Sequence, residues 1–247
     1  VIATNIDFAF IVQAISWDFN INRLERYLTI CNSSDIEPVI VLTKIDLIDK
    51  EAVEGLLEGI RRRIKQVKVI CISNLTQEGY EAIQAIIEKG KTYCMLGSSG
   101  VGKSTLINNL SGKALMQTGS ISDSTSKGRH VTSHRELVVL DKGGILIDNP
   151  GMREVGIADT ADGLEITFDT IIGLAENCRF KDCTHTSEVG CAVLEAIANG
   201  ELNDAAYENY MKMKREKMHY ESTVAEKRQR EKQFGKILKD YKKGNWK

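Results

Sequence analysis

Gly97-Ser98-Ser99-Gly100-Val101-Gly102-Lys103-Ser104 is the stretch from which the rest of the chain can be interpreted. The apolar run 93–96 precedes it, and a helical pattern over 105–110 follows it. A glycine-rich loop between a strand and a helix turns successive backbone N–H groups toward one phosphate, and the helix N-terminus adds positive potential. The alternative is a glycine-rich turn before an ordinary helix. The full eight-residue pattern in this context favours a site for a nucleoside triphosphate.

This loop also assigns roles to individual side chains. Lys103 would reach the β- and γ-phosphates and stabilise their charge, and the Ser104 hydroxyl would bind Mg²⁺. The loop and the residue after it supply the candidate triphosphate contacts: Gly97, Ser98, Ser99, Gly100, Val101, Gly102, Lys103, Ser104 and Thr105.

The sequence before the loop alternates apolar runs with helical patterns. Strands are expected at 6–15, 39–42, 67–72 and 93–96, and helices at 20–31, 52–64 and 80–87. Two more strands, 135–140 and 144–147, follow the loop and are joined by a short turn. This alternation predicts an α/β fold with a mostly parallel sheet and helices on both faces.

Two loops at expected strand ends carry the chemistry for recognising guanine. Asp46 in Thr43-Lys44-Ile45-Asp46 would accept hydrogen bonds from guanine N1–H and its amine, and the Lys44 stem would pack along the base. Ser73 and Asn74 follow the next strand, where a backbone N–H can reach guanine O6. Carboxyl ends of parallel strands share one edge of a sheet, so these loops should converge. Thr43 replaces the commoner asparagine, which would loosen a contact to guanine N7 or to the phosphate-binding loop.

A polar stretch, 111–133, separates the phosphate-binding helix from the last two strands. Within it, Gly128-Arg129-His130-Val131-Thr132 offers the Thr132 hydroxyl to Mg²⁺, as in a switch loop ordered by the γ-phosphate. An ordinary surface loop is the alternative. The last strand ends in Asp148-Asn149-Pro150-Gly151, from which Asp148 would hold Mg²⁺ through a water and the Gly151 N–H would contact the γ-phosphate.

These motifs stand in the order base loops, P-loop, switch threonine, DxPG, whereas ordinary GTPases begin with the P-loop. With GSSGVGKS, TKID, GRHVTSHREL and DNPGMRE in that order, the chain resembles the circularly permuted, ribosome small-subunit-dependent GTPases of the RsgA/YjeQ family. The resemblance implies GTP hydrolysis stimulated by the 30S subunit and a role in late maturation of that subunit. A GTP-gated RNA-binding switch without turnover of its own remains an alternative. An ATP-using small-molecule kinase is disfavoured by the TKID loop.

The catalytic water has no obvious partner in the sequence. Met152 follows Gly151, where many small GTPases carry a glutamine, and a thioether cannot orient water by hydrogen bonding. Slow intrinsic hydrolysis is therefore expected, with Lys103, His130 and Thr132 as the candidate catalytic residues.

Three cysteines and one histidine lie within 14 residues: Cys178, Cys183, His185 and Cys191. This donor set suits one closed tetrahedral Zn²⁺ site, which the resemblance also implies. Small buried cysteines with a stray histidine are the alternative, and disulfides are unexpected in a cytosolic protein. The remaining cysteines, at 31, 71 and 94, stand singly in apolar runs and indicate core positions.

The C-terminal end is basic although the whole chain has a formal net charge of −1. Residues 211–247 hold 13 Lys and Arg against 5 Asp and Glu. We expect a helix over 204–242, which the resemblance implies docks on 16S rRNA, whereas on charge alone a solvated helix is the alternative. The candidate RNA contacts are Lys227, Arg228, Arg230, Lys232, Lys236 and Lys239.

These patterns divide the chain into a permuted GTPase domain at 1–160 and a zinc-binding helical domain at 161–247. The family typically has an N-terminal OB-fold, which precedes the segment corresponding to Val1 and is not present in this sequence. The expected partners are GTP, GDP and the small ribosomal subunit, with Mg²⁺ and Zn²⁺ as cofactors. A cytoplasmic monomer without a membrane segment is expected.

Overall fold

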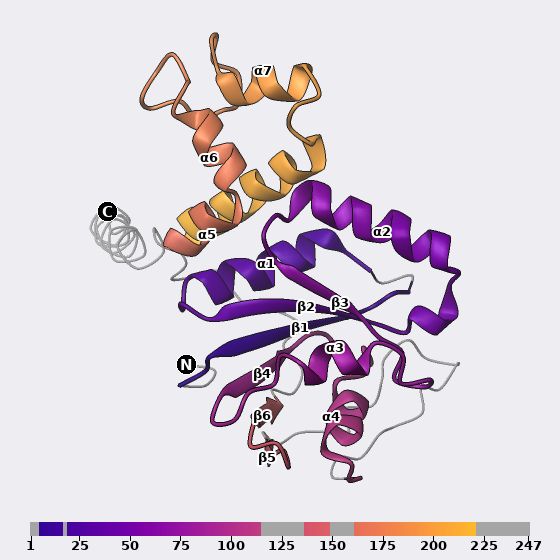
Figure 1. Ribbon diagram of the computed structural model, residues 1–247. Coiled ribbons are helices and arrows are strands. Elements are labelled where there is room, and N and C mark those ends of the chain that lie inside the picture. Colours follow the sequence, from indigo (N-terminus) through magenta and orange to yellow (C-terminus); the bar gives the residue numbers. More distant parts are fainter. Residues whose placement is uncertain (1–4, 17–18, 115–135, 149–160, 221–247) are drawn as a thin grey trace, which may run out of the picture.

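The computed structural model describes residues 5–16, 19–114, 136–148 and 161–220 (Figure 1). These ranges form a helix-covered sheet followed by a helical unit, whose orange ribbon lies beside α1 and α2 in Figure 1. None of the helices within these ranges is long and apolar enough to cross a bilayer.

The sheet has six strands in the order β3-β2-β1-β4-β6-β5. All neighbouring strands are parallel except β5 and β6, which form an antiparallel pair at one edge. This arrangement confirms the mostly parallel α/β fold. The strand bounds are β1 (Phe8–Ala14), β2 (Glu37–Thr43), β3 (Lys68–Cys71), β4 (Thr92–Leu96), β5 (Glu136–Val139) and β6 (Ile145–Asp148).

Helices cover both faces of the sheet, as Figure 1 shows. The core on one face joins side chains of α1 and α2, and the core on the other joins those of α3 and α4. A single 3-10 turn, η1 (Ile45–Leu47), follows β2. The helix bounds are α1 (Ile21–Asn32), α2 (Lys50–Arg63), α3 (Tyr80–Gln84) and α4 (Lys103–Ser111).

Strand β1 lies in the middle of the sheet and is buried on both faces. Phe10 and Val12 point into the core beside α3 and α4, whereas Ala9 and Ile11 point into the core beside α1 and α2. An uninterrupted apolar run is what a central parallel strand requires, because neither of its faces meets water.

Helix α1 begins at a side-chain cap and buries one face. The Asn20 carboxamide oxygen accepts a hydrogen bond of 2.9 Å from the Asn22 N–H, which satisfies one of the open N–H groups of the first turn. Leu24, Leu28 and Cys31 then follow at helical spacing and are buried against the sheet. The cap and the apolar stripe together explain why the chain is helical here.

The residues after the sheet form a helical unit with a core of its own. Its helices are α5 (Ala161–Thr167), α6 (Asp169–Ala175), α7 (Ala192–Ala198) and a longer helix over 204–220. Phe168, Ile171, Val193 and Met213 are buried together between these helices. The expected helix over 204–242 is therefore observed as far as residue 220, and its remainder lies outside the described residues.

One helix ends earlier than the sequence predicted. The pattern over 80–87 predicted a helix through Ile87, but α3 ends at Gln84. The Tyr93 hydroxyl, from β4, donates to the Ile86 carbonyl at 2.7 Å and accepts from the Glu88 N–H at 2.9 Å. These two hydrogen bonds hold the backbone in a turn, so Ile87 is buried without being helical.

Candidate functional site

The phosphate-binding loop leaves β4 and enters α4 with close packing on both sides. Gly97 and Gly102 have positive φ angles, and a Cβ atom on either would meet neighbouring atoms. At Gly97 it would lie 2.3 Å from the Val12 carbonyl oxygen, and at Gly102 it would lie 2.4 Å from Asn74 Nδ2. At both positions the backbone angle favours glycine, and at Gly97 the Val12 backbone also leaves no space for a Cβ atom.

Lys103 lies folded inside this loop and is almost fully buried. Its ammonium group donates hydrogen bonds to the carbonyls of Gly97 at 2.8 Å and Ser98 at 2.7 Å. Burial lowers the pKa of Lys103, and the charge of Asp148 opposes that shift. A buried ammonium held by carbonyls is positioned to meet an anion that enters the loop.

Asp148, the last residue of β6, is buried with 1% of its surface exposed. Burial raises the pKa of its carboxyl, and the nearby Lys103 charge partly offsets that shift. Among the residues that the structure describes, its Oδ1 is the sole buried side-chain nitrogen or oxygen without a hydrogen-bond partner. Buried acceptors are normally paired, so this orphaned oxygen fits a water of a Mg²⁺ shell.

Thr43 connects the base loop to the phosphate-binding loop. Its side chain is fully buried, and its hydroxyl donates a hydrogen bond of 2.6 Å to the Val101 carbonyl. Thr43 therefore contacts the P-loop through its own hydroxyl, and the looser contact expected relative to asparagine stays a prediction. Next in the chain, Lys44 has a left-handed backbone with φ 63°, and Asp46 is exposed at the start of η1.

Asn74 fastens the second base loop to the same P-loop. Its Nδ2 donates to the Gly102 carbonyl at 3.0 Å, and its Oδ1 accepts from the Tyr80 hydroxyl at 2.6 Å. Asn109 of α4 donates to the Asn74 carbonyl at 3.0 Å and to the Tyr80 hydroxyl at 2.9 Å. Sequence reasoning missed Tyr80 and Asn109, since neither belongs to a motif and only the fold brings them together.

Ser73 organises its own turn. Its hydroxyl accepts from the N–H groups of Leu75 at 3.2 Å and Thr76 at 3.1 Å. Its N–H donates to the Glu78 carbonyl at 3.1 Å. A hydrogen bond to guanine O6 would therefore come from a neighbouring N–H of this turn and not from that of Ser73.

Part of the expected site lies outside the described residues. This applies to His130, Thr132, Gly151 and Met152, and to all the candidate RNA contacts from Lys227 to Lys239. Ser99 and Gly100 form the exposed tip of the P-loop, whereas Ser104 and Thr105 lie in the first turn of α4 and are half-buried.

The four candidate zinc ligands converge in the helical unit. Their ligand atoms all lie within 4.8 Å of one another. His185 Nδ1 is 3.6 Å from Cys178 Sγ and 3.5 Å from Cys191 Sγ, and these two sulfurs are 3.9 Å apart. Tetrahedral Zn²⁺ with bonds of about 2.3 Å to sulfur and about 2.1 Å to nitrogen separates its ligands by about 3.6–3.8 Å. The cluster therefore fits Zn²⁺.

The backbone around His185 is also fixed. His185 has a left-handed conformation with φ 63°, which is costly for a residue other than glycine. Its carbonyl accepts a hydrogen bond of 2.6 Å from the Tyr207 hydroxyl, on the helix over 204–220. That helix thus supports the loop from which the histidine ring enters the cluster.

The fold and this site define a class of protein. The P-loop lies at the carboxyl edge of the parallel sheet, where it is hydrogen-bonded to the two base loops through Thr43 and Asn74. Both base loops precede the P-loop in the chain. This is the arrangement of a circularly permuted P-loop nucleotide-binding protein.

The comparisons with known families agree with this class. The family model described as RsgA GTPase matches residues 1–158. A model described as ABC transporter matches residues 80–245, a range that includes the P-loop. Both families contain a P-loop, so the P-loop alone does not distinguish them. The base loops lie before residue 80, and only the RsgA GTPase match includes them. The chain belongs to the RsgA GTPase family.

Curated relatives and solved structures support the same assignment. A protein of Listeria innocua named small ribosomal subunit biogenesis GTPase RsgA 1 is 46% identical over 89% of this chain and 63% of its own length. A Vibrio vulnificus protein named RsgA 2 is 45% identical over 96% of this chain and 68% of its own length. This chain thus spans about two thirds of these relatives.

Two solved structures share the fold. The crystal structure of YjeQ from Thermotoga maritima is 28% identical with a TM-score of 0.61, and the match covers 85% of this chain and 70% of that one. YloQ, described as a circularly permuted GTPase, is 27% identical with a TM-score of 0.60 over 87% of this chain and 69% of that one.

Proposed function

We propose that this protein hydrolyses GTP and assists the maturation of the small ribosomal subunit. The observation that carries the proposal is the direct bonding of both base loops to the P-loop, through Thr43 to Val101 and through Asn74 to Gly102. Base and phosphate recognition are thereby held in one rigid frame. The names of the relatives, small ribosomal subunit biogenesis GTPases, supply the biological setting.

Guanine would be selected by Asp46, whose exposed carboxylate can accept from N1–H and the exocyclic amine. Adenine presents no such donor pair, so the wrong base leaves the carboxylate unpaired. The Lys44 stem would lie along the base, and an N–H of the turn at Ser73 would reach O6. The remaining GTP contacts would come from the P-loop, Thr105 and the Gly151 N–H.

The triphosphate end would be held by the P-loop amides and by Lys103, which exchanges its two carbonyl partners for phosphate oxygens. Mg²⁺ would supply further neutralisation of charge on the β- and γ-phosphates. Ser104 and Asp148 fit its shell, and Thr132 is the third candidate. Because Met152 cannot orient the attacking water, we propose His130 for that role, completed by the ribosomal partner.

The helical unit is proposed as the part that meets RNA. A division at residue 160 separates the nucleotide domain from a unit that would contain one structural Zn²⁺, held by Cys178, Cys183, His185 and Cys191. The basic end beyond it would contact 16S rRNA phosphates through salt-dependent interactions. We propose a monomeric, cytoplasmic protein.

The test is GTP hydrolysis measured with purified 30S, 50S and 70S particles. We expect slow basal hydrolysis that rises strongly with 30S particles alone, and equal rates with and without them would overturn the proposed coupling. Asp46→Asn should remove the preference for GTP over ATP, whereas Glu51→Gln, an exposed carboxylate nearby on α2, should keep it. Single-turnover hydrolysis by His130→Ala tests the proposed water-positioning role.

A further inference from the structure

Helix α1 touches the phosphate-binding loop at its first turn. Arg23 Nη1 donates a hydrogen bond of 3.2 Å to the Ser98 hydroxyl. Ser98 is 5% exposed, and its carbonyl accepts the hydrogen bond of 2.7 Å from Lys103 Nζ. Arg23 therefore positions Ser98, which in turn accepts a hydrogen bond from the P-loop lysine Lys103. Arg23 itself is not part of the P-loop motif.

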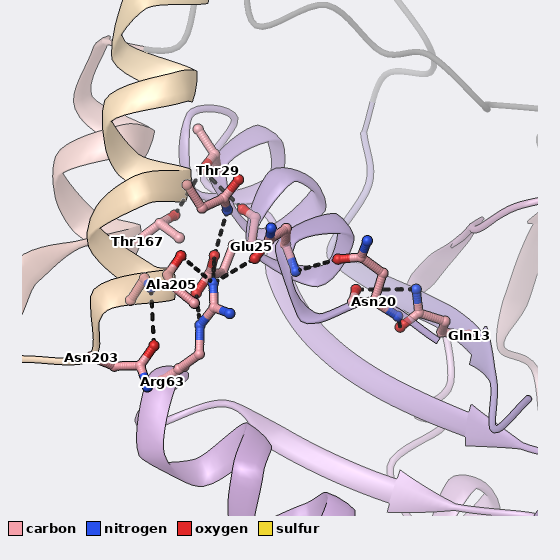
Figure 2. A network of polar contacts seen from close by, with 11 residues as sticks. Gln13, Asn20, Glu25, Thr29, Arg63, Thr167, Asn203 and Ala205 are labelled. Carbon is pink, nitrogen blue, oxygen red and sulfur yellow. Dashed lines mark hydrogen bonds and ion pairs between the residues drawn. The ribbon is translucent and has the colours of Figure 1, made fainter. Parts of the chain in front are cut away.

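The start of α1 is fixed to the centre of the sheet, as Figure 2 shows. The buried Gln13 of β1 donates to the Asn20 carbonyl at 3.3 Å and accepts from the Asn20 N–H at 3.4 Å. This pair ties the N-terminal cap of α1 to the strand beside β4. A movement of α1 would therefore also displace the edge of the sheet at which the P-loop lies.

Two residues after Arg23, Glu25 of α1 is bonded to the helical unit. The Glu25 carboxylate is 2% exposed and forms a two-pronged ion pair with Arg63 of α2, at 2.9 and 2.6 Å. Asn209 Nδ2 also donates to Glu25, and Arg63 donates to the Ala205 carbonyl at 3.4 Å. Figure 2 shows Arg63 between Glu25 and Ala205. The helix over 204–220 thus completes a buried polar cluster on α1.

Two more contacts extend this grip. Arg26 forms a two-pronged ion pair with Glu216 at 2.7 and 2.6 Å. The Thr29 hydroxyl is 3.2 Å from that of Thr167 in α5. A Cβ atom on Gly163 of α5 would lie 2.2 Å from the Thr29 carbonyl oxygen, so the two helices touch backbone to backbone.

We propose that Arg23 is a positioning residue for the P-loop, and that α1 transmits the docking of the helical unit to the nucleotide site through it. The inference rests on the proposed binding of a guanine nucleotide. The same short helix contacts Ser98 at one end and the helical unit over its next two turns. If the two contacts are coupled, a change that separates α1 from the helical unit changes the affinity for the nucleotide. By thermodynamic linkage, nucleotide binding then changes the equilibrium constant for docking of the helical unit on α1 by the same factor.

The first test concerns Arg23 alone. Arg23→Gln should weaken binding of a fluorescent GDP analogue about tenfold, the size expected when a hydrogen bond from a charged donor is lost. Arg23→Lys, which keeps a charged donor, should stay within about threefold of wild type. GMP, which lacks the β-phosphate, should bind both variants as it binds wild type. Equal weakening of GDP and GMP would indicate a merely structural role and overturn the proposal.

The second test perturbs the far side of α1. Gly163→Ala places a methyl group against backbone atoms of α1, so α5 must move away. We expect GDP binding to weaken about fivefold, within the usual range of coupling between sites. In the Arg23→Gln background the same change should weaken binding less than about twofold, because the transmitting contact is already absent. Glu58→Gln, an exposed change on α2, is the control and should leave binding unchanged.

Two results would overturn the inference: GDP affinity unchanged in Gly163→Ala, or losses that simply multiply in the double variant. If Gly163→Ala does not fold, as judged by circular dichroism, Glu216→Gln takes its place with the same expectations. A wild-type protein that binds no guanine nucleotide would overturn the proposed function together with this inference. If the wild-type protein binds GDP but the changes between α1 and the helical unit leave GDP affinity unaltered, the inference alone would be overturned.

Discussion

Asn74→Ala should destabilise the protein even when no nucleotide is present. The substitution removes the hydrogen bonds from Asn74 Nδ2 to the Gly102 carbonyl and from the Tyr80 hydroxyl to Asn74 Oδ1. The Tyr80 hydroxyl keeps its contact with Asn109, and the Gly102 carbonyl keeps its hydrogen bond of 2.9 Å from the Leu106 N–H. Two neutral hydrogen bonds at about 1 kcal/mol each give a loss of about 2 kcal/mol.

The loss should be visible as a shift in Tm. At about 2–4 °C per kcal/mol for a chain of this length, Tm should fall by about 4–8 °C. The assay is thermal unfolding followed by circular dichroism without nucleotide or Mg²⁺. Leu75→Ala is the matched control, because the Leu75 side chain in the same turn is 83% exposed.

A second variant separates holding the loops together from contacting the base. Asp46→Ala removes an exposed carboxylate, so it should leave the Tm unchanged while it abolishes the preference for guanine. An Asn74→Ala protein that unfolds at the wild-type temperature would refute the reasoning, since the frame of hydrogen bonds would then carry no stability of its own.

Three further predictions concern Asp148, the zinc cluster and Glu25. Asp148→Asn should keep or raise the Tm of the nucleotide-free protein, because burial disfavours the charged form of this carboxyl and raises its pKa. Nucleotide binding should lose its dependence on Mg²⁺, and a marked fall in Tm would contradict the prediction. Cys183→Ser should lower zinc, measured by atomic emission, from one equivalent to nearly none, and unchanged zinc would refute the assigned cluster. Burial raises the pKa of Glu25 in the folded protein. The folded state therefore binds more protons than the unfolded state, and the free energy of unfolding falls as pH rises from the unfolded to the folded pKa of this group. Urea unfolding at several pH values should therefore show wild type losing stability relative to Glu25→Gln as pH rises, and a constant difference would contradict the shift.

The sequence predicted the centre of the sheet well because β1, β2 and β4 are buried along most of their length. Nearly continuous apolar runs such as 6–15 have few other places in a fold, and the structure confirms β1 there. The P-loop and the base loops were found because their chemistry needs fixed residue types at fixed spacing. The zinc candidates were found for the same reason, and the structure brings their side chains together.

What the sequence could not predict depends on contacts between distant segments. Nothing local to Asn109 or Tyr80 indicates that they brace a base loop, and nothing in α1 indicates that Arg23 reaches Ser98. The early end of α3 has the same origin, because it is imposed by a tyrosine of the next strand. A motif can be found in the sequence because ligand binding requires particular residue types at fixed spacing. The contacts that support the motif depend on the fold, so the sequence alone does not show them.

The pairing of β1 bears on how the chain assembles. Phe8 pairs with Glu37 on one side and with the more distant Tyr93 on the other. Closing the shorter loop costs less entropy, and synthesis proceeds from the N-terminal side. We therefore expect β1, β2 and β3, with the loops at 43–46 and 73–74 that are proposed to bind guanine, to assemble before the P-loop strand is added. In an unpermuted order, the phosphate-binding half would be made first.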